Sequence, residues 1–119
     1  MPLRIRLDRL KTFVLAQPQT TVVRQWGGLV FKAVGKVFVM LILDGEVLSS
    51  VIFKCTPDEF DELTQLDGVG QAPYCAKRMW VRVEDLAALP EKELQQRIHA
   101  SYRLVVDKLP KKTRINLGL

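Results

Sequence analysis

The chain has 119 residues, a length typical of one domain and sufficient to bury a core without disulfide or metal staples. Hydrophobic residues make up 48% and charged residues 26%, a composition that argues against disorder. The net charge of +5 permits binding to a polyanion without requiring it, because an ordinary soluble protein with a basic pI has the same excess.

The distribution of apolar and charged residues does not match a membrane span or a signal peptide. The longest apolar run, residues 37–43, is too short to span a membrane. Arg4, Arg6 and Arg9 lie in the first turns, where a signal peptide would need an apolar segment. The two cysteines are few for a secreted scaffold. We therefore expect a cytoplasmic protein with reduced thiols and no membrane partner.

The first elements are a helix and a short strand. Apolar residues recur at helical spacing over residues 7–17, with Asp8 as the expected N-cap and Pro18 as the stop. Residues 19–26 contain a β-branched run, which predicts a short edge strand. Gly27 and Gly28 then interrupt the chain.

Residues 29–54 are the centre of the predicted fold. Three apolar, β-branched runs are separated by Val34-Gly35 and by Asp44-Gly45-Glu46, which predicts antiparallel strands joined by tight turns. The middle run, residues 37–43, is apolar on both faces, so its second face needs a cover. The C-terminal tail and another chain are both candidates for that cover.

The second half predicts further helices and one strand. Thr56 and Glu59 match a capping box with Pro57 at the first helical position, and this helix ends at residues 67–70, before a loop through Pro73. Residues 79–83 predict a strand and residues 84–89 a helical turn. The longest helix follows Pro90 and closes at Pro110, leaving residues 111–119 as a tail. We expect a single α+β domain over residues 1–119, an antiparallel sheet with helices packed on one face.

The chain resembles the MmcQ/YjbR family of small bacterial proteins, whose fold is similar to that of CyaY, the bacterial frataxin. The resemblance is carried by residues 30–38 (VFKAVGKVF), 53–57 (FKCTP), 77–81 (KRMWV) and 101–105 (SYRLV), the last running on through Leu109-Pro110-Lys111-Lys112. It implies a two-layer α+β sandwich of the CyaY/YjbR kind, DNA binding through a double-wing arrangement of strands and turns, and no catalytic residues.

The sequence departs from this family at two places. The family pattern has Asn and His in the polar run before the Trp, where this chain has Ala76 and Met79. The first helix contains one acid, so the acidic ridge of frataxins is missing and iron delivery is not expected.

Strand alternation singles out one candidate surface. If Phe31, Phe53 and Val81 face the helices, the opposite face carries cations interleaved with one ring: Lys32, Lys54, Trp80 and Arg82, with Arg78 just before. Cations attract phosphates and a ring can stack on a base, so the set suits a nucleic acid. A solvated sheet face, with Trp80 covering Val30 and Ile52, explains the same pattern, and so does a protein-docking face.

A second basic set lies near the C-terminus. It comprises Lys108, Lys111, Lys112 and Arg114. These side chains can grip phosphate, complete the helix C-terminus or simply be solvated. The turn at Gly35-Lys36 suits a wing that contacts DNA, whereas Asp44 and Glu46 oppose that role at the next turn.

No catalytic or metal site is predicted. His99 is the single histidine and is expected at the surface. Cys55 is expected in the core, and nearby cations are expected to lower the pKa of Cys75. The acidic cluster Asp58, Glu59, Asp61 and Glu62 belongs to a short helix, and Gly68-Val69-Gly70 lacks the pattern of a phosphate loop.

Three functions remain open from the sequence. A nucleic-acid-binding module is the first, with DNA or RNA as partner and binding that weakens as salt rises. A protein-interaction module or a homodimer is the second, with salt-tolerant association. An enzyme is the least expected, and we predict neither a cofactor nor a metal.

Overall fold

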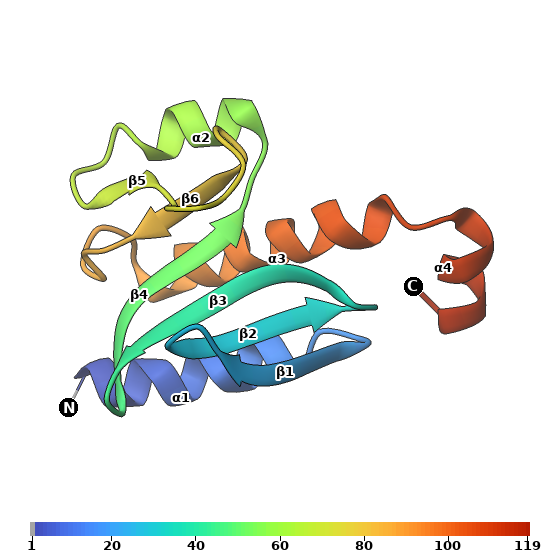
Figure 1. Ribbon diagram of the computed structural model, residues 1–119, viewed down its shortest axis with the longest axis horizontal. Coiled ribbons are helices and arrows are strands. Elements are labelled where there is room, and N and C mark those ends of the chain that lie inside the picture. Colours follow the sequence, from blue (N-terminus) through green and yellow to red (C-terminus); the bar gives the residue numbers. More distant parts are fainter. Residues whose placement is uncertain (1) are drawn as a thin grey trace.

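The computed structural model describes the backbone of residues 2–119 and the side chains from Leu7 onward, so Arg4 and Arg6 lie outside the described side chains. The helices are α1 (Pro2–Leu15), α2 (Pro57–Leu63), α3 (Glu91–Asp107) and α4 (Lys111–Leu117). The strands are β1 (Thr20–Gln25), β2 (Gly28–Ala33), β3 (Lys36–Asp44), β4 (Val47–Lys54), β5 (Val69–Gln71) and β6 (Trp80–Val83). Figure 1 shows their arrangement.

The strands form one six-stranded sheet in the order β1-β2-β3-β4-β6-β5, with every pair antiparallel. The predicted meander is β2, β3 and β4, and β1 is the predicted edge strand. The α+β fold is therefore confirmed. Strand β5 was not predicted, because it has three residues, one of which is Gly70, and shows no alternation.

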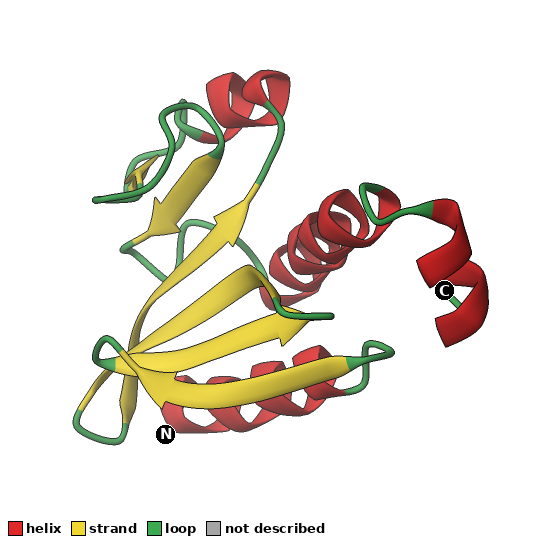
Figure 2. Cartoon of the chain, turned by 45° about the vertical axis from the view of Figure 1, so that its right-hand side comes forward, coloured by secondary structure: helices red, strands yellow, loops and turns green. Residues whose placement is uncertain are grey.

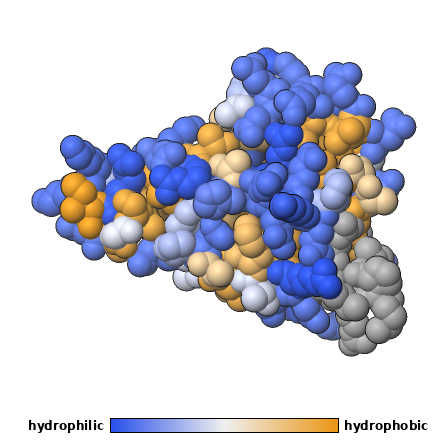
Figure 3. Space-filling view, turned by 180° about the vertical axis from the view of Figure 1, so that it is seen from behind, coloured by the Kyte–Doolittle hydropathy of each residue, from blue (hydrophilic) through white to orange (hydrophobic). Residues whose placement is uncertain are grey.

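Helices α1 and α3 pack side by side against one face of this sheet (Figures 1 and 2). The main core lies between these layers and includes Leu10 and Val14 of α1 and Phe31 and Phe53 of the sheet. From α3 it takes the side chains at helical spacing: Leu94, Ile98, Tyr102 and Val105. Seen from behind, the helix side is covered mainly by hydrophilic residues (Figure 3), as expected of helices whose apolar sides face inward.

A buried serine joins α3 to the centre of the sheet. The Ser101 hydroxyl donates to the Phe38 carbonyl oxygen at 2.6 Å and accepts from the Lys54 backbone N–H at 2.9 Å. Phe38 is the extra residue of a β-bulge, since Phe31 pairs with Val39 and Lys32 pairs with Val37. The bulge lets Phe38 and Val39 both join the main core.

The second face of the sheet has its own small cluster, formed by Val30, Met40, Ile52 and Ala72. Ala72 comes from the loop after β5, and Cys75 of the same loop packs on the cluster. The predicted cover, the C-terminal tail or another chain, is therefore wrong for this part of the face. A segment next to β5 supplies the cover instead.

Several predicted ends differ from the observed ones. Helix α1 begins at Pro2, so Asp8 lies inside the helix and is not its N-cap. The capping box is confirmed: Glu59 N–H donates to Thr56 Oγ1 at 3.1 Å and Thr56 N–H donates to Glu59 Oε1 at 2.9 Å. Residues 84–89 form a turn and not a helix.

The predicted C-terminal tail is also wrong, because residues 111–117 form α4. Pro110 ends one helix and precedes the next, where its missing N–H costs nothing. Gly118 closes α4 in the left-handed conformation, at φ 73°. Helix α4 lies beyond the end of the sheet, past the C-terminal end of α3 (Figure 1). Among residues 2–119, no helix has the length and apolar content needed to cross a membrane.

Candidate functional site

The sheet face opposite α1 and α3 is called the open face below. Lys54 pairs with Trp80 and Ile52 pairs with Arg82, and directly paired residues point to the same side of a sheet. Lys32 follows the same alternation as Val30, which belongs to the open-face cluster. The predicted placement of Lys32, Lys54, Trp80 and Arg82 on one face is therefore observed.

Trp80 is half-buried on this face. Its indole packs against the apolar cluster of Val30, Met40 and Ile52, as one of the sequence interpretations expected. Trp80 also lines a second site, a pocket that contains three lysine side chains.

Two predicted cations are already paired with carboxylates. Arg78 donates to Asp61 Oδ2 at 2.7 Å, and Arg82 forms an ion pair with Glu84. Both pairs are solvent-exposed, and exposed pairs contribute about 0–1 kcal/mol each. A phosphate can therefore replace either carboxylate at little cost, but neither arginine is a free positive charge in the unbound protein.

Three lysines line one pocket at the end of the sheet, where the open face meets the C-terminal end of α3. Lys36, Lys54 and Lys108 line a pocket of about 470 Å³, here called the lysine pocket. Its apolar walls are Val37, Trp80, Val105 and Leu109. None of the three lysines has an ion pair within the described part of the chain. Burial lowers the pKa of Lys54, and the neighbouring Lys108 and Lys36 lower this pKa further by repulsion.

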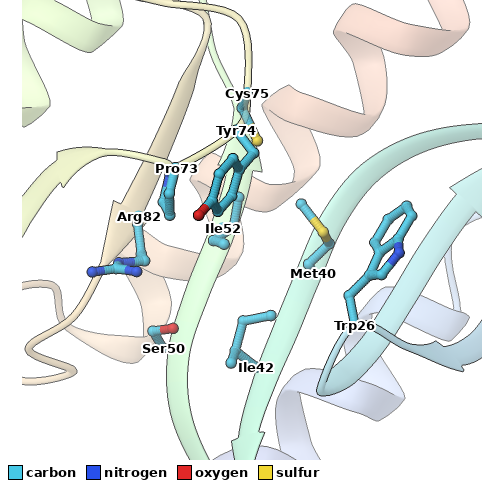
Figure 4. A pocket seen from close by; sticks show the side chains of 9 residues that line it. All are labelled: Trp26, Met40, Ile42, Ser50, Ile52, Pro73, Tyr74, Cys75 and Arg82. Carbon is cyan, nitrogen blue, oxygen red and sulfur yellow. The ribbon is translucent and has the colours of Figure 1, made fainter.

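A second pocket of about 550 Å³, here called the aromatic groove, lies toward the other end of the open face. Figure 4 shows Trp26 and Tyr74 on opposite sides of it, with Met40 and Ile42 between them and Ile52 next to Tyr74. Trp26 is 65% exposed and Tyr74 is fully exposed. The remaining lining residues are Ser50, Pro73, Cys75 and Arg82. The groove therefore combines two accessible rings, an apolar floor and one guanidinium.

Both rings are carried by residues with positive φ. Trp26 has φ 53° in the two-residue turn that joins β1 to β2, and Tyr74 has φ 62° in the loop after β5. Bulky residues rarely adopt this conformation, which costs of order 1–3 kcal/mol. Sequence reasoning missed both residues, although their positions beside Gly27 and Pro73 marked them as turn residues.

The C-terminal basic residues do not join the open face as a group. Lys111 and Lys112 are exposed on α4, beyond the end of the sheet. Arg114 is half-buried, and its Nε is buried without a hydrogen-bond partner among the described residues. Lys108 of the predicted C-terminal set lines the lysine pocket at the end of the sheet.

The surroundings of the two thiols and of the histidine do not activate these groups for chemistry. Cys55 is buried, and desolvation raises its pKa to about 11. Burial also raises the pKa of Cys75, so the predicted lowering by nearby cations is wrong. His99 is exposed, and its Nδ1 lies 2.9 Å from Gln17 Oε1.

The acidic cluster of α2 is used for ion pairs. Arg97 of α3 pairs with Glu59 and Glu62, and Asp61 pairs with Arg78. Among the described side chains, no group of three or more His, Cys, Asp or Glu residues is arranged to hold a metal ion.

Comparison with known proteins adds a family and a fold. The YjbR family model matches residues 15–104. The crystal structure of Deinococcus radiodurans protein DR2400, which has a DUF419 domain, is 23% identical with a TM-score of 0.79, covering 95% of this chain and 88% of that one. A protein from Pseudomonas syringae is 19% identical with a TM-score of 0.66, covering 82% of this chain and 96% of that one. At these identities the two structures show a shared fold. No curated protein matches the chain significantly.

Proposed function

We propose that this chain, which belongs to the YjbR family, is a nucleic-acid-binding protein that holds a single strand across its open face. In this proposal, bases stack on the rings of the aromatic groove and phosphates contact the lysines at the other end. The proposal includes no catalytic step.

The observation that carries the proposal is the presence of an aromatic groove on the open face and of a lysine pocket at the end of the same sheet. The aromatic groove supplies exposed Trp26 and Tyr74, and the lysine pocket supplies cations without carboxylate partners in the described chain. Proteins that bind single strands combine stacking rings with a positively charged track. Each base stacked on a ring is worth about 1–3 kcal/mol.

The geometry favours a single strand over a duplex. Duplex bases are already stacked on each other, so exposed rings on a sheet gain little from them, whereas unpaired bases are free to stack. The double-wing mode would use the turns at both ends of β3. The turn at Lys36 suits it, but Asp44 and Glu46 place carboxylates at the other turn. We therefore assign the stacking role to the aromatic groove.

The test is a fluorescence titration with labelled thymidine oligonucleotides and with a duplex of equal length, at low and at raised salt. We expect binding that weakens steeply with salt and favours the single strand. Tyr74→Ala is expected to weaken it about tenfold. Ile115→Ala is the matched control, because Ile115 is 67% exposed on α4, away from both pockets. An absence of binding to every oligonucleotide at low salt would contradict the proposal.

The same groove also supports a second function. Exposed Trp26 and Tyr74 beside the apolar floor of Met40, Ile42 and Ile52 resemble the aromatic anchors of protein interfaces. A protein partner, or a second copy of this chain, would bind with little dependence on salt. Sedimentation at high concentration separates this case, since a homodimer would appear there and would weaken in Tyr74→Ala.

A further inference from the structure

The lysine pocket brings together three cations that come from separate elements. Lys36 begins β3, Lys54 ends β4, and Lys108 follows α3. Lys108 and Lys36 repel the ammonium group of Lys54, and this repulsion adds to burial in lowering the pKa of Lys54. No acid of the described chain forms an ion pair with any of them.

The surrounding structure sets the backbone positions of these lysines. Ser101, inside α3, accepts a hydrogen bond from the Lys54 backbone N–H and so joins the end of β4 to this helix. Helix α3 caps at Lys108, whose N–H donates to the Val106 carbonyl oxygen. Lys36 follows the two-residue turn Val34-Gly35, in which both residues have positive φ, as type I′ turns require. Packing and turns therefore fix the backbone positions of the three lysines, and attraction among the side chains plays no part.

Lys54 is the member of this cluster that the charges affect most. It is half-buried, the exposed Lys36 and Lys108 repel it, and no carboxylate of the described chain forms an ion pair with it. Groups held against their electrostatic preference in a pocket are typical of ligand sites. We propose that the lysine pocket binds a terminal phosphate monoester, carried by the end of a nucleic-acid strand or by a free nucleotide.

The charge of the ligand decides between a monoester and a diester. A phosphate monoester carries about −1.5 to −2 charges at pH 7, whereas each phosphodiester of a strand carries one. Three converging ammonium groups therefore match an end better than an internal linkage. The volume of about 470 Å³ lies in the range of small-ligand sites. Trp80 in the wall gives the first base or the free nucleotide a ring to contact.

The strand-end form of this inference rests on the proposed function, whereas the free-nucleotide form does not. The experiment compares an eight-nucleotide thymidine strand with a 5′-phosphate, the same strand with a 5′-hydroxyl, and thymidine monophosphate. We expect the phosphorylated strand to bind about tenfold more tightly than the hydroxyl strand. Lys54→Gln and, separately, Lys108→Gln are expected to remove that difference. Lys92→Gln, at an exposed position on α3 outside the pocket, is the control and is expected to keep it.

Each remaining outcome is decisive. Equal binding of the two strands, with no binding of thymidine monophosphate, overturns the inference and leaves the proposed function standing. Binding of thymidine monophosphate that Lys54→Gln abolishes, without binding of either strand, supports the inference and overturns the proposed function. A 5′-phosphate preference that survives both Lys54→Gln and Lys108→Gln overturns the inference, because the phosphate would then bind outside the lysine pocket.

Discussion

Lys54 and Lys108 line the same pocket at the end of the sheet, although they come from different elements and repel each other. Ser101 of α3 joins the two elements, because its hydroxyl accepts a hydrogen bond from the Lys54 backbone N–H. Packing in the main core therefore imposes an electrostatic cost on the surface.

Replacing Lys54 is expected to stabilise the protein. In Lys54→Met the repulsion from Lys108 and Lys36 is lost, and we expect the free energy of unfolding to rise by less than about 1 kcal/mol, because the group is partly solvated. The pKa of Lys54 is lowered from 10.5, so the charge opposes folding fully below the folded-state pKa. The gain should shrink as pH rises toward 10.5. Urea unfolding at neutral and alkaline pH measures this gain in stability. A loss of stability at neutral pH would contradict the prediction, because it would show that favourable interactions of Lys54 outweigh the repulsion.

Removing the Ser101 hydroxyl is expected to destabilise the protein. In Ser101→Ala, the Phe38 carbonyl oxygen and the Lys54 N–H lose a buried partner. Each unpaired buried group costs about 1–3 kcal/mol. We expect a loss of about 2 kcal/mol in denaturant unfolding. Ser49→Ala, at an exposed position of β4, is the control, and equal stability of the two variants would refute the assigned role.

The Cys55 thiol is expected to limit stability at high pH. Its pKa is raised from 9.0 to about 11, first by desolvation, so the folded state keeps a proton that the unfolded state loses. The unfolded chain then binds fewer protons, and stability should fall as pH rises from 9.0 through about 11. In Cys55→Ala this part of the pH dependence should disappear. Thiol labelling gives a second readout, because Cys55 should react only upon unfolding, and rapid labelling of the native Cys75→Ser variant would contradict its burial.

Replacing Trp26 in its strained turn is expected to raise stability and to weaken binding. Asn-Gly is the preferred type I′ dipeptide, so Trp26→Asn should raise the free energy of unfolding by about 1 kcal/mol. The same variant loses one wall of the aromatic groove and should bind the thymidine strand more weakly. Val34→Asn makes the same change in the turn between β2 and β3 and should stabilise without that loss. Equal binding by both variants would remove Trp26 from the site.

Much of the fold follows from local pattern. Alternation in β2 and β4 placed Phe31 and Phe53 toward the helices, because neighbouring side chains of a strand point to opposite faces. The capping box at Thr56 and Glu59 marked the start of α2 through contacts only three residues apart. The same alternation placed Lys54 and Trp80 on the open face. These features depend on residues that are near each other in the chain.

The tertiary structure decided the rest, because it depends on contacts between distant residues. No local pattern shows that the loop carrying Ala72 and Cys75 covers the second face of β3, or that Tyr74 is then left exposed across a groove from Trp26. The sequence pattern assigned Lys108 to a basic C-terminal set. The packing of α3 against β4 brings this residue into the same pocket as Lys54. The sequence by itself determined which residues face the core and which face outward. How the outward residues meet was set by the paths of loops and helix ends, which residue periodicity does not encode.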